Sequence, residues 1–135
     1  MVDSIVWAMI IRTLIVDDSD LTAELIGVYL RAIPSIELVA SVKSAREALA
    51  IAASSPPDLV ITDLRMDFMN GIELAERLRR EHPEIRVILI SVEKTSQLAL
   101  NAAHRGVDAF VDKGDLHQEL LSSIHKLFPD SLHSL

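Results

Sequence analysis

Residues 14–20 read LIVDDSD, a run of strand-forming apolar residues that ends in two adjacent aspartates. Neighbouring carboxylates repel each other, so a fold gains no stability from placing Asp17 and Asp18 together at the end of a buried strand. The pair therefore indicates either a solvated turn or a site for a positively charged group. The rest of the chain distinguishes between these two interpretations.

Short apolar runs alternate with longer amphipathic segments along the chain. We predict strands at residues 10–16, 36–42, 58–62, 86–92 and 108–112, and helices at residues 20–32, 44–53, 72–82, 95–105 and 115–128. Nearly continuous apolar strands are typical of a sheet that is covered by helices on both faces. Strict alternation with right-handed crossovers then predicts an α/β fold built on an open, parallel, doubly wound sheet.

Local signals support several of these boundaries. Ser44 followed by Glu47 is a capping-box signature for the second predicted helix. Asn70 and Gly71 together indicate a turn before the third. The first predicted helix carries an apolar stripe at helical spacing, formed by Leu21, Leu25, Val28 and Tyr29.

Composition limits the classes of function. The chain has 135 residues, of which half are apolar and only 4% aromatic, so we expect one domain with an aliphatic core. Its formal net charge of −7 argues against a nucleic-acid-binding surface, which is normally basic. The absence of cysteine excludes disulfides and thiolate sites and is compatible with the cytoplasm.

The ends of the chain are expected to lie outside the domain. We assign residues 10–128 to the domain, residues 1–9 to an N-terminal extension and residues 129–135 to a C-terminal tail. The apolar N-terminal segment predicts neither a signal peptide nor a membrane span. Asp3 is acidic, and Arg12 interrupts the run before the roughly 20 apolar residues that a spanning helix needs.

Polar and charged residues stand at the ends of four predicted strands. They are Asp17 and Asp18 after the first strand, Asp63 after the third, Ser91 on the fourth and Lys113 after the fifth. In doubly wound sheets, ligands bind beyond the carboxyl ends of the strands. We therefore expect these side chains to meet at one rim of the sheet.

Three carboxylates at one rim indicate a cation, because close carboxylates raise one another's pKa unless a positive charge shares the site. Mg²⁺ suits such a set, since it typically binds one or two carboxylates and retains several waters. A lysine and a hydroxyl beside it complete a pocket for a phosphoryl group. An aspartate can accept that group as an acyl phosphate.

Four motifs, in this order, resemble the receiver domain of two-component response regulators: LIVDDSD, VITDLRMDFMNG, LIS and AFVDKG. The resemblance covers about residues 10–128 and implies a flavodoxin-like (βα)5 fold with strand order 2-1-3-4-5. The segments IPSIELV and DLRM, with a lysine that is not followed by proline, are most similar to the subfamily that usually carries a helix-turn-helix output domain.

The resemblance implies a metal site built around the phospho-acceptor. Asp63 matches the residue that takes the phosphoryl group and also binds the metal, Mg²⁺ or Mn²⁺. Asp17 and Asp18 match the acidic pair, with Asp18 as the direct ligand and Asp17 acting partly through water. The backbone carbonyl of Arg65 matches the remaining protein ligand.

The resemblance also implies a set of residues that respond to the phosphoryl group. Lys113 matches the lysine that pairs with it, and Ser91 matches the hydroxyl that follows it. Phe110 matches the aromatic residue that changes rotamer in the active state. These roles rest on the family pattern, because a lone strand-end hydroxyl or a strand aromatic is otherwise typical of ordinary packing.

The function implied is a signalling module and not an enzyme acting on other substrates. A histidine kinase or phosphotransfer protein would phosphorylate Asp63, and the face formed by the fourth helix, fifth strand and fifth helix would signal to an output domain or effector. The resemblance allows a phosphorylation-dependent homodimer. It implies a cytoplasmic protein, with no direct contact to nucleic acid or membrane through this domain.

The chain departs from the family pattern at three positions. Asp67 stands where proline is usual, and Gly114 follows Lys113 where many members have a cis proline. Val92 follows Ser91 where a small residue is common, so its stiff β-branched side chain is expected to narrow access to the pocket. We expect the side chains of Glu93 and Arg65 to modulate attack by water on the acyl phosphate.

Other functions remain open at this point. An interaction-only pseudo-receiver stays open because of Val92 and Gly114. An aspartyl phosphatase or phosphotransferase usually needs a second aspartate where this chain has Arg65. Flavin binding fits less well, because the loop DDSDLT is acidic. The segment HQELLSSIHKL resembles a phospho-accepting histidine helix, but such a site needs a helical bundle.

Overall fold

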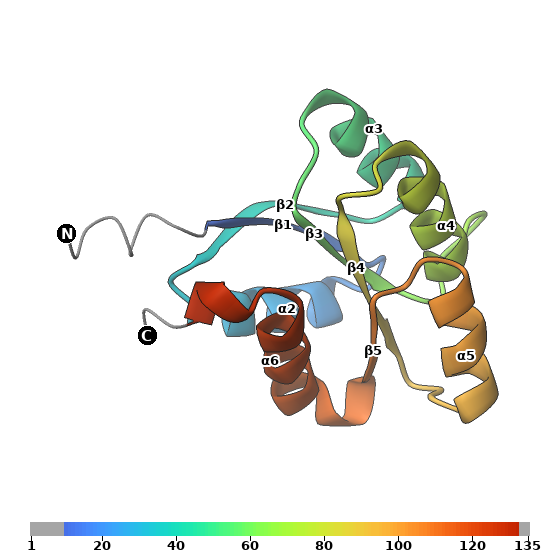
Figure 1. The fold of residues 1–135 in the computed structure, drawn as a ribbon. Helices are drawn as coiled ribbons and strands as arrows, with labels where there is room; N and C mark the ends of the chain where they lie inside the picture. The colour runs from blue at the N-terminus through green and yellow to red at the C-terminus, as the bar shows by residue number, and fades with distance from the viewer. Residues whose placement is uncertain (1–9, 133–135) are drawn as a thin grey trace.

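The computed structural model describes residues 10–132 and shows one central sheet between two layers of helices (Figure 1). Its five parallel strands have the order β2-β1-β3-β4-β5, which confirms the predicted fold class and strand order. The strands are β1 (Ile11–Val16), β2 (Ile36–Val42), β3 (Leu59–Asp63), β4 (Arg86–Ser91) and β5 (Ala109–Asp112). The helices are α2 (Asp20–Arg31), α3 (Ala45–Ser54), α4 (Gly71–Glu81), α5 (Ser96–His104) and α6 (Leu116–Leu127).

Each face of the sheet has its own apolar core. Helices α3, α4 and α5 cover one face, and α2 and α6 cover the other (Figure 1). Adjacent residues of the strands alternate between the two cores, so that Leu14 and Val60 face the first core while Ile15 and Ile61 face the second. Burial on both faces explains why the strands read as continuous apolar runs.

Helix α2 has one apolar stripe toward the sheet and another toward solvent. Ile26 and Leu30 are buried against the sheet. The stripe that contains Leu21, Leu25 and Val28 lies toward solvent, with 79%, 42% and 54% of these residues exposed. Of the four residues named from the sequence, only Tyr29 packs against the core, so apolar spacing alone does not decide which stripe faces the sheet.

Asn70 and Gly71 begin helix α4 and do not form the separate turn that was expected. The Asn70 side chain accepts from the Glu73 amide, and the Glu73 carboxylate accepts from the Asn70 amide, which is a complete capping box. A Cβ atom at Gly71 would lie 2.3 Å from the Asp63 carbonyl oxygen. Glycine is therefore needed because the start of α4 packs directly on the end of β3.

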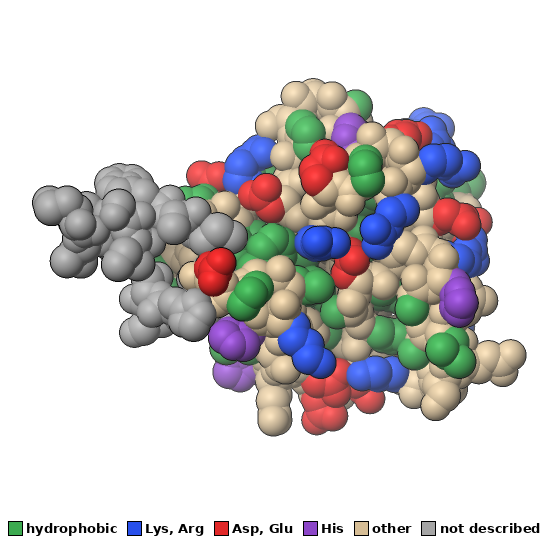
Figure 2. Space-filling model, in the orientation of Figure 1, with side chains coloured by type: hydrophobic (Ala, Val, Ile, Leu, Met, Phe, Trp, Pro, Cys, Tyr) green, Lys and Arg blue, Asp and Glu red, His purple; other side chains and the backbone are tan. Residues whose placement is uncertain are grey.

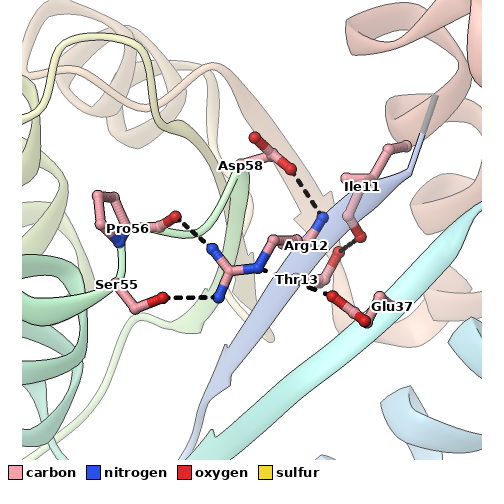
Figure 3. A network of polar contacts seen from close by, with 7 residues as sticks. All are labelled: Ile11, Arg12, Thr13, Glu37, Ser55, Pro56 and Asp58. Carbon is pink, nitrogen blue, oxygen red and sulfur yellow. Dashed lines mark hydrogen bonds and ion pairs between the residues drawn. The ribbon is translucent and has the colours of Figure 1, made fainter. Parts of the chain in front are cut away.

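Arg12 links β1 to the connection between α3 and β3, at the end of the sheet opposite the carboxyl ends of the strands (Figure 3). Its guanidinium donates to the Pro56 carbonyl at 2.7 Å and to Ser55 Oγ at 2.9 Å. Its backbone amide donates to Asp58 Oδ2 at 2.8 Å. These contacts hold the connection between α3 and β3 against β1, far along the strands from the carboxyl-end rim.

The surface mixes both signs of charge. On the face in view, acidic and basic side chains are interspersed with exposed apolar ones (Figure 2). No helix within residues 10–132 is long and apolar enough to cross a membrane. The expected extension at residues 1–9 lies outside the described residues, as do residues 133–135 of the expected tail, while Pro129–Leu132 form a 3₁₀ turn.

Candidate functional site

The strand register places the predicted site residues side by side. Val16 pairs with Thr62, so Asp17 and Asp63 follow at the same level on neighbouring strands. On the other side of β3, Asp63 pairs with Ile90, and one residue further along, Ser91 pairs with Asp112. Parallel strands all end at the same edge, which is why residues distant in sequence meet here.

Asp17, Asp18 and Asp63 form an acidic cluster. Each offers a carboxylate oxygen, and these oxygens all lie within 4.8 Å of one another. Asp17 and Asp63 are buried, with 2% and 9% of each residue exposed, whereas Asp18 lies at the surface. The cluster therefore has two buried members and one that faces solvent.

Burial raises the pKa of both inner carboxyl groups. For Asp17, the Ser19 amide donates to Oδ1 at 2.8 Å and lowers the pKa, while the charges of Asp63 and Asp18 raise it. For Asp63, burial is the largest cause, and the ammonium of Lys113 opposes it. A buried pair of carboxyl groups with raised pKa values holds its negative charge at a cost in free energy, which a bound cation would remove.

The donor set fits a hard divalent cation. Asp17 Oδ2 is buried and has no hydrogen-bond partner, although buried carboxylate oxygens are normally paired. Carboxylate and carbonyl oxygens are the ligands that Mg²⁺ prefers. The unpartnered oxygen and the close carboxylates together indicate a cation at this rim.

Lys113 reaches the cluster from the end of β5. Its Nζ lies 3.7 Å from Asp63 Oδ1, and 25% of the lysine side chain is exposed. The bond from Lys113 to Gly114 is trans, and the chain continues into a 3₁₀ turn in which the Gly114 amide donates to Asp112 Oδ1. The turn brings the ammonium to the rim without the cis proline that many family members use.

Ser91 lies on β4 and Phe110 on β5, the two strands that follow β3 across the sheet. Ser91 is 2% exposed, and its Oγ accepts from the Glu93 amide at 3.0 Å. Phe110 is partly buried against the core under α3, α4 and α5, and Lys94 Nζ lies 6.0 Å from its ring centroid. The hydroxyl is thus engaged with the loop that follows β4.

Arg65, Val92 and Glu93 lie on the loops that follow β3 and β4. Arg65 and Glu93 form an ion pair at 2.7 Å that joins the loop after β3 to the loop after β4. Val92 is 69% exposed. An open hollow of about 460 Å³, called here the mouth of the site, lies beside the cluster and is lined by Asp18, Arg65, Met66, Asp67, Phe68, Asn70 and Glu73. The loop after β3 therefore borders this hollow, and the ion pair links the loop after β4 to it.

Phe68 is a feature of this mouth that the sequence patterns did not reveal. Its φ is 68°, and the Met69 amide donates to the Asp67 carbonyl at 2.8 Å across it. A hydrogen bond from residue i+2 to residue i across a positive φ forms a strained γ-turn. The Phe68 side chain is fully exposed. Only Asp67, where proline is usual, pointed to an altered loop.

Comparison with known proteins identifies the family. A profile of the response regulator receiver domain matches residues 13–125. The chain belongs to the response regulator receiver domain family. The acidic cluster of Asp17, Asp18 and Asp63 is consistent with the phospho-accepting site of such a domain.

Two named response regulators illustrate the similarity of this chain to known proteins. The response regulator protein VraR of Staphylococcus aureus is 30% identical over 118 residues, which are 87% of this chain and 56% of VraR. A LuxR-family two-component response regulator from Aurantimonas is 28% identical, with a TM-score of 0.78 and coverage of 87% of this chain and 84% of that one. The chain thus spans about half the length of the curated relative that it matches.

A third relative was solved in complex with ligands. The structure of a CheX–CheY–BeF3–Mg²⁺ complex from Borrelia burgdorferi is 24% identical to this chain, with a TM-score of 0.80, and covers 89% of this chain and 90% of that one. At this identity the likeness shows the shared fold.

Proposed function

We propose that Asp63 accepts a phosphoryl group from a histidine kinase or a phosphotransfer protein and that the product is an acyl phosphate. The observation that carries this proposal is the convergence of three carboxylate oxygens within 4.8 Å, with an ammonium 3.7 Å from Asp63. A structural role does not explain two buried carboxyl groups with raised pKa values beside an unpartnered oxygen. A receiver site does explain them.

The proposed metal is Mg²⁺ or Mn²⁺, held by Asp17, Asp18, Asp63 and the backbone carbonyl of Arg65. Asp18 is the direct ligand, and Asp17 acts partly through water. The metal supplies positive charge against the phosphoryl oxygens. The beryllofluoride and Mg²⁺ present in the Borrelia complex support this assignment by analogy of fold.

The chain's own residues then carry the transfer. A carboxylate oxygen of Asp63 attacks phosphorus, the donor's nitrogen–phosphorus bond breaks, and the electron pair stays on the imidazole nitrogen. Lys113 neutralises a phosphoryl oxygen, and the Ser91 hydroxyl donates to another. Burial of Asp63 limits the access of water to the acyl phosphate.

We propose that Ser91 and Phe110 transmit the change. The Ser91 hydroxyl turns toward the phosphoryl group, Phe110 changes rotamer, and the face formed by α5, β5 and α6 presents a new surface to an output domain or effector. The receiver unit comprises residues 10–128, and it acts in the cytoplasm as a signalling module whose chemistry is limited to its own phosphorylation and dephosphorylation.

Helix α2 offers a docking surface for the phosphoryl donor. The helix begins at Asp20, directly after the acidic pair, so a donor that reaches Asp63 also covers its first turns. Leu21, Leu25 and Val28 form the exposed apolar stripe on this helix. Contiguity with the site and apolar character support contact with a helix of the donor.

The proposed function is tested by phosphorylation with a small donor. The protein is incubated with acetyl phosphate and Mg²⁺, and its intact mass is measured. The wild type is expected to gain one phosphate, Asp63→Asn none, and the matched control Asp67→Asn, which alters an exposed carboxylate on the same loop, as much as the wild type. A mass gain that survives Asp63→Asn, or that does not need Mg²⁺, would contradict the proposal.

A further inference from the structure

Glu119 on α6 joins three separate segments through one oxygen. Its Oε1 accepts from the Asp112 amide at 3.0 Å and lies 3.1 Å from Lys94 Nζ. Asp112 ends β5 and precedes Lys113, while Lys94 belongs to the loop at residues 92–95 that follows Ser91. We call this arrangement, in which Glu119 Oε1 contacts both Lys94 Nζ and the Asp112 amide, the loop anchor.

The loop at residues 92–95 is held from two sides. Glu93 pairs with Arg65 across the mouth of the site, and the next residue, Lys94, pairs with Glu119 on α6. The loop is attached to the site itself by the Glu93 amide, which donates to Ser91 Oγ. Movement of the Ser91 side chain would therefore break a hydrogen bond to this loop.

We propose that Glu119 is a positioning residue that holds the loop in the arrangement seen here, and that the active state requires the loop anchor to open. This inference rests on the proposed function, and it names a regulation of the same site. When the Ser91 hydroxyl turns toward a phosphoryl group, the Glu93 amide loses its acceptor. The loop then shifts and carries Lys94 with it.

Glu119 does not follow this movement, because α6 is fixed by its buried face of Leu116, Leu120 and Ile124. Lys94 also stands over Phe110, with 6.0 Å between its Nζ and the ring centroid. Departure of Lys94 therefore frees the aromatic ring to change rotamer. One ion pair thus couples the position of Ser91 to that of Phe110.

The loop anchor contributes enough free energy to shift the equilibrium between the inactive and active states, but not enough to prevent the transition. Lys94 and Glu119 have side chains that are 36% and 31% exposed, so their pair is partly screened by water. Removal of a pair of this kind is expected to shift a two-state equilibrium, and the apparent affinity of a ligand for the active state, by about two- to fivefold.

The test is a titration with beryllofluoride in excess Mg²⁺, followed by amide chemical shifts, for the wild type and four variants. Glu119→Gln keeps an acceptor for the Asp112 amide and removes the charge, while Lys94→Met removes the ammonium and keeps the stem. The third variant combines both changes. Glu76→Gln is the control, because Glu76 forms an ion pair of equal length, 3.1 Å, with Arg105 elsewhere on the surface.

Each single variant is expected to raise the apparent affinity for beryllofluoride by about two- to fivefold, with Glu76→Gln unchanged. The two single variants change the net charge in opposite directions. A general electrostatic effect on anion binding would therefore shift the two affinities in opposite directions, whereas loss of the loop anchor raises both. The double variant is expected to gain no more than either single variant, since both remove the same contact.

The outcomes separate this inference from the proposed function. A wild type that binds beryllofluoride, with unchanged or opposite shifts in the two single variants, would overturn the role of the loop anchor alone. Additive gains in the double variant would overturn it as well, because the two side chains would then act independently. A wild type that does not bind beryllofluoride in Mg²⁺ would overturn the proposed function and this inference with it.

Discussion

Removal of the Asp17 charge is expected to stabilise the metal-free protein. The variant Asp17→Asn keeps an oxygen that accepts from the Ser19 amide and places a neutral group where Oδ2 has no partner. The carboxylate oxygens of Asp17 and Asp63 lie within 4.8 Å of each other, so with an effective dielectric constant of about 20 their charges repel by at least about 3.5 kcal/mol. Lys113 offsets part of this repulsion, so we expect a net gain of about 1–2 kcal/mol at neutral pH.

The dependence of this gain on pH follows from the raised pKa of Asp17. Burial makes the folded protein bind the Asp17 proton more tightly than the unfolded chain, whose pKa is near 3.8. The folded wild type is therefore favoured below that pH, and this advantage is lost as the pH rises through the raised folded pKa. The gain of the variant should appear over the same rise in pH and vanish in acid.

Mg²⁺ should reverse the order of stability. The wild type gains about 2.7 kcal/mol when Mg²⁺ is present at 100 times its dissociation constant, while Asp17→Asn gains much less. Urea denaturation with and without Mg²⁺, at several pH values, measures both effects, and Asp67→Asn is the control. An Asp17→Asn protein that is less stable than the wild type without metal, or equally stabilised by Mg²⁺, would refute this reasoning.

Six further variants, two of them controls, test individual features. Gly71→Ala should lower the free energy of unfolding by about 3 kcal/mol, because its Cβ would lie 2.3 Å from the Asp63 carbonyl oxygen. In contrast, the Cβ of Gly27→Ala would make only ordinary van der Waals contact with the Arg31 side chain, at 3.5 Å, so this change should stabilise α2 by up to about 1 kcal/mol. Phe68→Gly should raise stability by about 0.5–1 kcal/mol by relieving the positive φ, and Phe68→Ala should give no such gain; equal effects in denaturation would argue against strain at this turn. Val92→Ala should speed phosphorylation by acetyl phosphate and hydrolysis of the acyl phosphate, each by up to about tenfold in stopped-flow measurements, and unchanged rates would show that Val92 does not guard the pocket. Leu25→Asp should slow transfer from a histidine kinase but leave labelling by acetyl phosphate unchanged, whereas equal rates with both donors would exclude α2 from docking.

Much of the site was predictable because ligand-binding residues of a parallel sheet lie at the carboxyl ends of its strands. Asp17, Asp63 and Lys113 each follow or end an apolar run, and parallel strands bring such positions to a single rim whatever their separation in sequence. The alternation of apolar runs with amphipathic segments was likewise sufficient for the order of the helices and strands. Both inferences depend only on local patterns and a general rule of topology.

Contacts between distant segments lay beyond such patterns. Helix α2 carries two apolar stripes, and only packing against the sheet selects the one with Ile26 and Leu30 over the one with Leu21 and Leu25. The same holds for Gly71, whose need for glycine comes from the Asp63 carbonyl and not from a turn.

The sequence therefore determined which residues stand at the carboxyl-end rim, whereas the tertiary structure alone decided what holds them there. Glu119 shows the difference most clearly. Its place in the sequence alone is typical of a solvent-exposed residue on an amphipathic helix. Its contact with Lys94, at a separation of 25 residues, exists because β4, β5 and α6 lie side by side in the folded chain. A side chain's partners across the fold depend on the packing of whole elements, which no local spacing of residues encodes.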